Sequence, residues 1–127
     1  MYEGGIMRTK YPVGFFIDIN RIAISIKPSE IGLAGLVRSE SDLYFLGLKL
    51  ESCEDTFERA ANALYGIAYY HPFYEGNKRT ALLTCELLLD GLRIDAPEKE
   101  IYHFVLDVAC GRVDIGYITK WLKDNTH

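Results

Sequence analysis

A short segment near the middle of the chain, residues 71–80, gathers side chains that together suit the binding of phosphate. It holds a histidine, a carboxylate, a glycine, an amide and two cations, and a leucine-rich segment with helical periodicity follows at once. Phosphate is attracted to the N-terminus of a helix because the first backbone N–H groups have no acceptor within the helix. In order, the residues are His71, Pro72, Phe73, Tyr74, Glu75, Gly76, Asn77, Lys78, Arg79 and Thr80.

Four consecutive residues of this segment can contact a phosphate directly. Gly76 lets the backbone approach an oxyanion without a side chain in the way, and Asn77 can donate a side-chain hydrogen bond to the same anion. Lys78 adds a point charge, and Arg79 can hold phosphate oxygens with its planar guanidinium. We therefore expect these four residues to form a binding site for the phosphates of a nucleotide.

The other residues of the segment suggest a reaction at the bound phosphate. Glu75 is an acid among cations, and it suits the coordination of Mg²⁺ against phosphates. His71 can take a proton from an attacking hydroxyl, and Phe73 is expected to bury its ring and fix the loop. A lone histidine is more often structural than catalytic. The density of chemically useful residues beside a helix start is what favours an active site.

Two predicted helices flank this loop. The first presents one apolar face, and it should end near His71 because the following proline disfavours α geometry there. The second covers residues 77–90 and is apolar almost all round, which is typical of a helix at the centre of a core; Gly91 suits its end. The apolar face of the first helix consists of Phe57, Ala60, Ala61, Leu64, Ile67 and Ala68.

The remaining elements are also predicted to be helical. Residues 15–26 fit a strand or a helix, because they are rich in isoleucine yet place apolar residues on one helical face; we favour the helix. Residues 27–35 should form a loop, Ser39 should cap a short helix, and residues 47–54 should form a connector or a short extended flap. Further helices are expected over residues 97–111 and 114–124.

These elements predict an all-α fold: a single domain over residues 1–127 with about five or six helices and a frayed segment at residues 1–10. The chain of 127 residues is 49% hydrophobic and 25% charged, which is ordinary for a soluble protein. Its net charge of −4 argues against general nucleic-acid binding. The widely spaced cysteines, and the lack of a long apolar stretch or a signal-peptide core, predict a cytoplasmic protein that enters no membrane.

The segment H-P-F-Y-E-G-N-K-R-T resembles the signature of the Fic/Doc superfamily, H-x-F-x-[D/E]-[G/A]-N-[G/K]-R, at all of its fixed positions. The resemblance extends over roughly residues 35–122. It implies that His71 is the base that deprotonates a Ser, Thr or Tyr hydroxyl of a target protein, and that Glu75 holds Mg²⁺. It also implies that the remaining residues act as a buried anchor, an anion hole and a phosphate ligand; these are Phe73, then Gly76, Asn77 and Lys78, then Arg79.

Two positions bear on the branch of the superfamily. Members that attach AMP usually carry glycine after the asparagine and a second arginine three residues beyond the first; this chain has Lys78 and Leu82 there. Both departures resemble the Doc (death-on-curing) branch, toxins that act as protein kinases, although Leu82 is also explained as a core residue. The resemblance implies phosphate transfer from ATP, with Mg²⁺, to an intracellular protein. The alternatives are AMP transfer to a protein hydroxyl and a catalytically silent module that binds a nucleotide or a partner.

The resemblance also bears on partners. We find no copy of the inhibitory pattern [S/T]-x-x-x-E-[G/N] of many Fic proteins, so a Doc-like toxin would be restrained by a separate antitoxin. Family members use an extended flap to dock the target by strand addition, and the alternative for the candidate segment here is an ordinary loop. The candidate docking residues are Leu48, Lys49, Leu50, Glu51 and Ser52.

Overall fold

The computed structural model describes residues 2–3, 6–7, 9–26 and 32–127. Six helices and an antiparallel pair of two-residue strands make up the regular structure of these residues, which confirms the all-α prediction. The elements are β1 (Tyr2–Glu3), β2 (Ile6–Met7), α1 (Val13–Ile24), α2 (Glu40–Ser52), α3 (Thr56–Ala68), α4 (Asn77–Leu87), α5 (Glu98–Ala109) and α6 (Ile115–Asp124).

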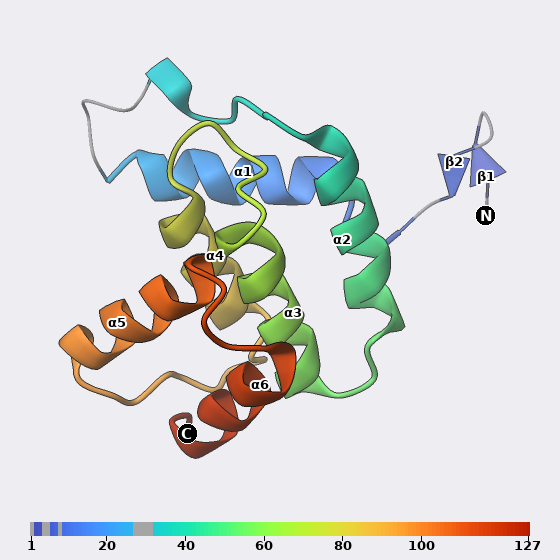
Figure 1. Ribbon diagram of the computed structural model, residues 1–127. Coiled ribbons are helices and arrows are strands. Elements are labelled where there is room, and N and C mark those ends of the chain that lie inside the picture. The colour runs from blue at the N-terminus through green and yellow to red at the C-terminus, as the bar shows by residue number, and fades with distance from the viewer. Residues whose placement is uncertain (1, 4–5, 8, 27–31) are drawn as a thin grey trace.

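Helix α3 is the centre of the fold. It packs against α2, α4, α5 and α6, while α1 packs on α4 and α2. Figure 1 shows α3 between α2 on one side and α5 and α6 on the other. Small residues let the neighbouring helices approach α3 closely, since Ala60, Ala61, Ala63 and Ala68 are all fully buried.

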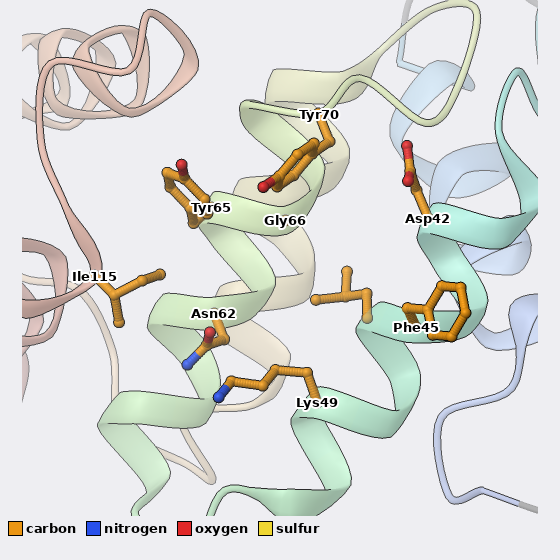
Figure 2. Close-up of a pocket in the computed structure, with 9 residues that line it drawn as sticks. Asp42, Phe45, Lys49, Asn62, Tyr65, Gly66, Tyr70 and Ile115 are labelled. Carbon is orange, nitrogen blue, oxygen red and sulfur yellow. The ribbon is translucent and has the colours of Figure 1, made fainter.

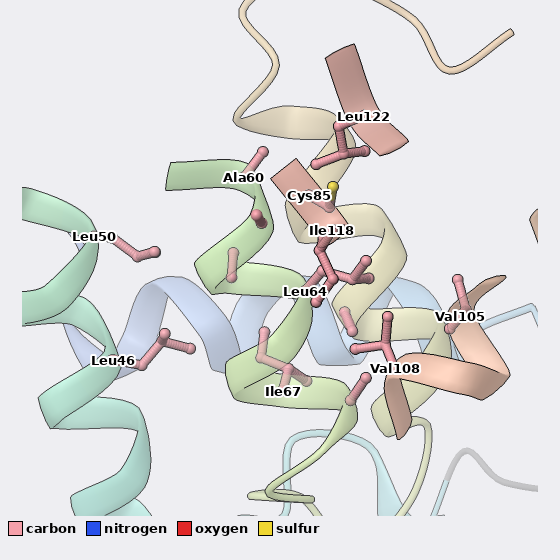
Figure 3. Packing of buried hydrophobic residues seen from close by; sticks show 14 of the residues in the cluster. Leu46, Leu50, Ala60, Leu64, Ile67, Cys85, Val105, Val108, Ile118 and Leu122 are labelled. Carbon is pink, nitrogen blue, oxygen red and sulfur yellow. The ribbon is translucent and has the colours of Figure 1, made fainter. Parts of the chain in front are cut away.

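The hydrophobic core joins side chains from all of these helices (Figure 3). Leu64 and Ile67 are the largest fully buried side chains of α3, the central helix. Burying an aliphatic side chain of this size stabilises a fold by about 1.5–3 kcal/mol. The core therefore fixes both helices that flank the motif loop. Its other labelled members are Leu46, Leu50, Ala60, Cys85, Val105, Val108, Ile118 and Leu122.

Side-chain caps begin three of the helices. Ser39 Oγ accepts a hydrogen bond from the backbone N–H of Asp42 at 3.4 Å, as the capping pattern predicted. Asp55 and Asp114 cap α3 and α6 in the same way, each at 2.8 Å. Such a cap satisfies a backbone donor that has no acceptor within the helix.

The expectation of an extended flap at residues 47–54 is wrong, because α2 continues to Ser52. Buried residues recur at helical spacing along α2, and Gly47 within it leaves room for the Tyr11 carbonyl oxygen, which would lie 2.1 Å from a Cβ at this position. Since a helix uses its own backbone donors and acceptors, this segment is not available for strand addition. The residues concerned are Leu48, Lys49, Leu50, Glu51 and Ser52.

Other boundaries differ by less. The helix expected over residues 77–90 ends at Leu87, and Asp90 and Gly91 follow with positive φ angles of 53° and 88°. The loop predicted for residues 27–35 falls partly on residues 27–31, and the frayed segment partly on residues 1, 4–5 and 8; all of these lie outside the described residues. In the part of the chain that the structure describes, no helix is long and apolar enough to cross a bilayer.

Candidate active site

The motif residues form the loop between α3 and α4 and the first turn of α4. This loop passes beside α1 (Figure 1). It lines an open cavity of about 270 Å³. The structure thus brings the predicted polar residues together around one space. The lining residues are His71, Tyr74, Glu75, Gly76, Asn77, Lys78 and Arg79.

The imidazole of His71 is exposed, and the hydrogen bond of one ring nitrogen assigns its tautomer. Nδ1 lies 2.9 Å from the carbonyl oxygen of Tyr69. A carbonyl oxygen can only accept, so in the neutral ring Nδ1 carries the proton and donates it to this hydrogen bond. Nε2 then keeps its lone pair. The arrangement prepares His71 to accept a proton at Nε2, as a general base must.

The backbone of His71 is in the left-handed region, with φ of 55°, immediately before a proline. This conformation costs a non-glycine residue about 1–2 kcal/mol and is held by surrounding contacts. Arg38 supplies two of them: its Nε donates to the His71 carbonyl at 2.8 Å, and its Nη2 donates to the Tyr70 carbonyl at 2.7 Å. The N–H of His71 donates to the carbonyl oxygen of Ile67 at 3.1 Å, which connects His71 to the end of α3.

The loop beyond His71 is fixed from two sides. Phe73 is 1% exposed and forms an isolated antiparallel bridge with Val37. Both backbone groups of Phe73 also bond to the side chain of Asn77: the N–H donates to Oδ1 at 3.0 Å, and Nδ2 donates to the carbonyl at 2.9 Å. The Asn77 amide therefore shapes the loop. The sequence had suggested that it donates to an anion, and the structure directs it to the main chain of Phe73 instead.

Gly76 is the N-cap of α4 and has a φ of 75°, which glycine adopts without strain. The first hydrogen bond of α4 runs from Thr80 N–H to the Gly76 carbonyl at 2.8 Å. The N–H groups of residues 77–79 have no acceptor within the helix, and they carry the positive end of its dipole. Lys78 is exposed at the cavity, while Arg79 is half-buried and donates from Nη1 to the Ala23 carbonyl of α1 at 3.1 Å.

A second, larger hollow lies on the neighbouring face of the molecule. It is a groove of about 390 Å³ between α2 and α3, with Ile115 of α6 at one side (Figure 2). Tyr70, which directly precedes His71, lines it together with Phe45 and Lys49 of α2. The sequence did not predict this groove, because it depends on how two helices pack.

The sequence model described as the Fic/DOC family matches residues 12–89, more than half of the chain. The chain belongs to the Fic/DOC family. No curated protein matches it. The matched stretch begins before α1, so this helix is part of the Fic/DOC match, although the sequence alone left the first thirty or so residues unassigned to the family.

Fic/DOC proteins are in general protein-modifying transferases that typically use ATP and Mg²⁺. Glu75 is half-buried in the cavity wall and is the carboxylate that would hold the metal. Among the described residues, no three His, Cys, Asp or Glu side chains gather as a metal site. Mg²⁺ commonly needs only one or two carboxylates when substrate phosphates and waters complete its shell, so this donor set fits a metal that arrives with the nucleotide.

Two residues that shape the site carried no clear signal in the sequence. Arg38 contacts His71 across 33 positions of the chain, and Asn20 contacts Glu75 across 55. The only local indication for Asn20 is that it is a polar residue between Ile19 and Ala23, on the apolar face of a predicted helix.

Proposed function

We propose that this Fic/DOC protein acts as a Doc-like toxin. It would transfer the γ-phosphoryl group of ATP to a Ser, Thr or Tyr hydroxyl of an intracellular protein, and a separate antitoxin would restrain it. The observation that carries the proposal is the placement of His71, whose Nε2 keeps a lone pair, on the same cavity as Glu75 and the N-terminus of α4. A base, a metal-binding carboxylate and an anion site are the parts that such a transfer requires.

In this reaction one proton moves to His71, and one phosphorus–oxygen bond forms while another breaks. Nε2 of His71 takes the hydroxyl proton while the hydroxyl oxygen bonds to the γ-phosphorus. The bond from that phosphorus to the bridging oxygen breaks, and ADP leaves with the electron pair. The N–H groups at the start of α4, together with Lys78 and Arg79, stabilise the charge on the phosphoryl oxygens. When bound at Glu75, Mg²⁺ neutralises phosphate charge.

Two residues favour phosphate transfer over AMP transfer. Lys78 places a long cationic side chain at the cavity, where glycine would leave room. Leu82 packs against the hydrophobic core, so it offers no cation for the far end of a triphosphate. Attachment of AMP by attack at the α-phosphorus is the alternative within the family, and it would use the same base.

The proposal is tested with ATP labelled at either the α or the γ phosphate, incubated with the protein and a cell extract. We expect transfer of the γ label to protein, and loss of transfer by about 10²–10⁴-fold in His71→Ala. His103→Ala is the matched control, because His103 is an exposed histidine on α5, outside the cavity. Transfer of the α label would establish AMP attachment, and equal transfer by wild type and His71→Ala would contradict both reactions.

A further inference from the structure

Asn20 is a fully buried polar side chain on α1, the helix that packs against α4 behind the motif loop. Burial of an amide is unfavourable unless its hydrogen bonds are made. Nδ2 donates to the Glu75 carbonyl and to Thr80 Oγ1, each at 3.0 Å, and Oδ1 accepts from the Gly35 N–H at 2.8 Å. Three segments distant in the sequence therefore meet at this one amide.

The network also fixes which way the amide faces. If the oxygen and nitrogen were exchanged, the oxygen would face the Glu75 carbonyl and the nitrogen would face the Gly35 N–H. Both contacts would then be repulsive. Asn20 is thus held in one orientation, with a donor aimed at Glu75.

The hydrogen bond from Asn20 to the Glu75 carbonyl also sets the direction of the next backbone N–H, that of Gly76. A trans peptide is planar, and its N–H points opposite to its C=O. The carbonyl of the Glu75–Gly76 peptide points to Asn20, so the N–H of Gly76 points away from α1. Gly76 lines the cavity, and within the described residues no hydrogen bond occupies this N–H.

We infer that Asn20 is a positioning residue of the transferase site. It holds the Glu75–Gly76 peptide so that the Gly76 N–H faces the bound phosphates and the Glu75 carboxylate stays at the cavity. This inference rests on the proposed nucleotide-dependent function and deepens it. Asn20 acts through the loop and touches no reacting atom, so its removal changes how phosphate is held rather than how the proton is taken.

The test compares two substitutions of Asn20 with one matched control. Asn20→Asp keeps the shape and the acceptor for Gly35 but replaces the donor to Glu75 with an oxygen. Asn20→Leu removes all three hydrogen bonds without placing a charge in the core. Thr84→Val is the control, because Thr84 is fully buried on α4 and donates only to the Thr80 carbonyl, at 2.7 Å.

The measurement is the dissociation constant of MgATP for the full chain, together with the ¹⁵N–¹H NMR shift of Gly76 during the titration. We expect affinity to fall about tenfold or more in both Asn20 variants, as the loss of a buried hydrogen bond implies, and to stay unchanged in Thr84→Val. Thermal unfolding of each variant shows that it is folded. If either Asn20 variant is unfolded, the wild-type protein still tests the inference, because the inference requires the Gly76 resonance to move when MgATP is added.

The outcomes separate this inference from the proposed function. Unchanged MgATP affinity in a folded Asn20 variant, or a Gly76 resonance that does not move while wild type binds MgATP, overturns the positioning role alone. Failure of the wild-type protein to bind MgATP overturns both.

Discussion

Substitution of Gly76 by alanine offers a quantitative test of how tightly the motif loop packs on α1. At a φ of 75°, an alanine is strained by about 1–2 kcal/mol. Its Cβ would also lie 2.9 Å from Cγ1 and 3.3 Å from Cδ1 of Ile24, and 3.5 Å from Nδ2 of Asn20. Overpacking of this kind typically costs about 1–3 kcal/mol more, so the total expected loss in the free energy of unfolding is about 2–5 kcal/mol.

The chain contains a control that separates the two contributions. Gly91 has a similar φ of 88°, but a Cβ there would meet nothing within 4 Å. Gly91→Ala should therefore show the backbone strain alone, about 1–2 kcal/mol. The difference between the two variants measures the collision with α1. In a double-mutant cycle, Ile24→Ala should reduce that difference, because it removes the atoms that the new Cβ would meet.

Urea denaturation followed by the fluorescence of Trp121 is a suitable assay. Trp121 is half-buried and stacks on Phe104 with ring centroids 3.8 Å apart, so its emission should change on unfolding. MgATP affinity, measured in the same variants, should fall in Gly76→Ala and stay unchanged in Gly91→Ala. Equal destabilisation by the two alanines would refute the close packing of the loop against α1.

Three further predictions concern the motif loop and the cysteines. Arg38→Gln should lower the transfer rate by about 10²-fold with little change in MgATP affinity, because the two carbonyl contacts that hold the backbone at His71 are lost. Steady-state kinetics measure the rate and a binding titration measures the affinity. An equal fall in rate and affinity would count against a role of Arg38 in holding His71. Phe73→Ala should cost about 3–5 kcal/mol in urea denaturation, since its ring is 1% exposed, and a loss below 1 kcal/mol would mean that the ring does not anchor the loop. Burial raises the pKa of the Cys85 thiol, so at mildly alkaline pH iodoacetamide should label the exposed Cys110 before Cys85 in the native protein. Mass spectrometry of peptides measures the order of labelling, and early labelling of Cys85 would contradict its burial.

The sequence contained enough information to predict the motif loop and most of the helices. The signature places its polar residues beside a helix start, and the proline after His71 ends the preceding helix, so local rules suffice there. The cap at Ser39 is local in the same sense. The helix at residues 15–26 was correctly preferred over a strand, because apolar spacing outweighed the β-branched residues.

The predictions that were wrong or missing concern residues whose structure is determined by tertiary contacts. Residues 47–54 were predicted to form a connector or a short extended flap, yet α2 continues to Ser52, and the lack of a Cβ at Gly47 serves a close approach to the Tyr11 carbonyl. The amide of Asn77 was available in principle to an anion, and the structure uses it on the backbone of Phe73. The hydrogen bonds of Asn20 depend on partners that only the packing of α1 brings near, so the local pattern shows no more than a polar residue on an apolar helix face.

The central claim is that the His71 cavity transfers part of ATP to a protein hydroxyl. The most direct test is the mass gained by proteins in cells that express the chain, compared with cells that express His71→Ala at the same level. We predict added phosphoryl groups on Ser, Thr or Tyr side chains with the wild-type chain and none above background with His71→Ala. Added adenylyl groups would mean that AMP is transferred instead of phosphate, with His71 still acting as the base. Identical protein masses in both cultures would contradict the account.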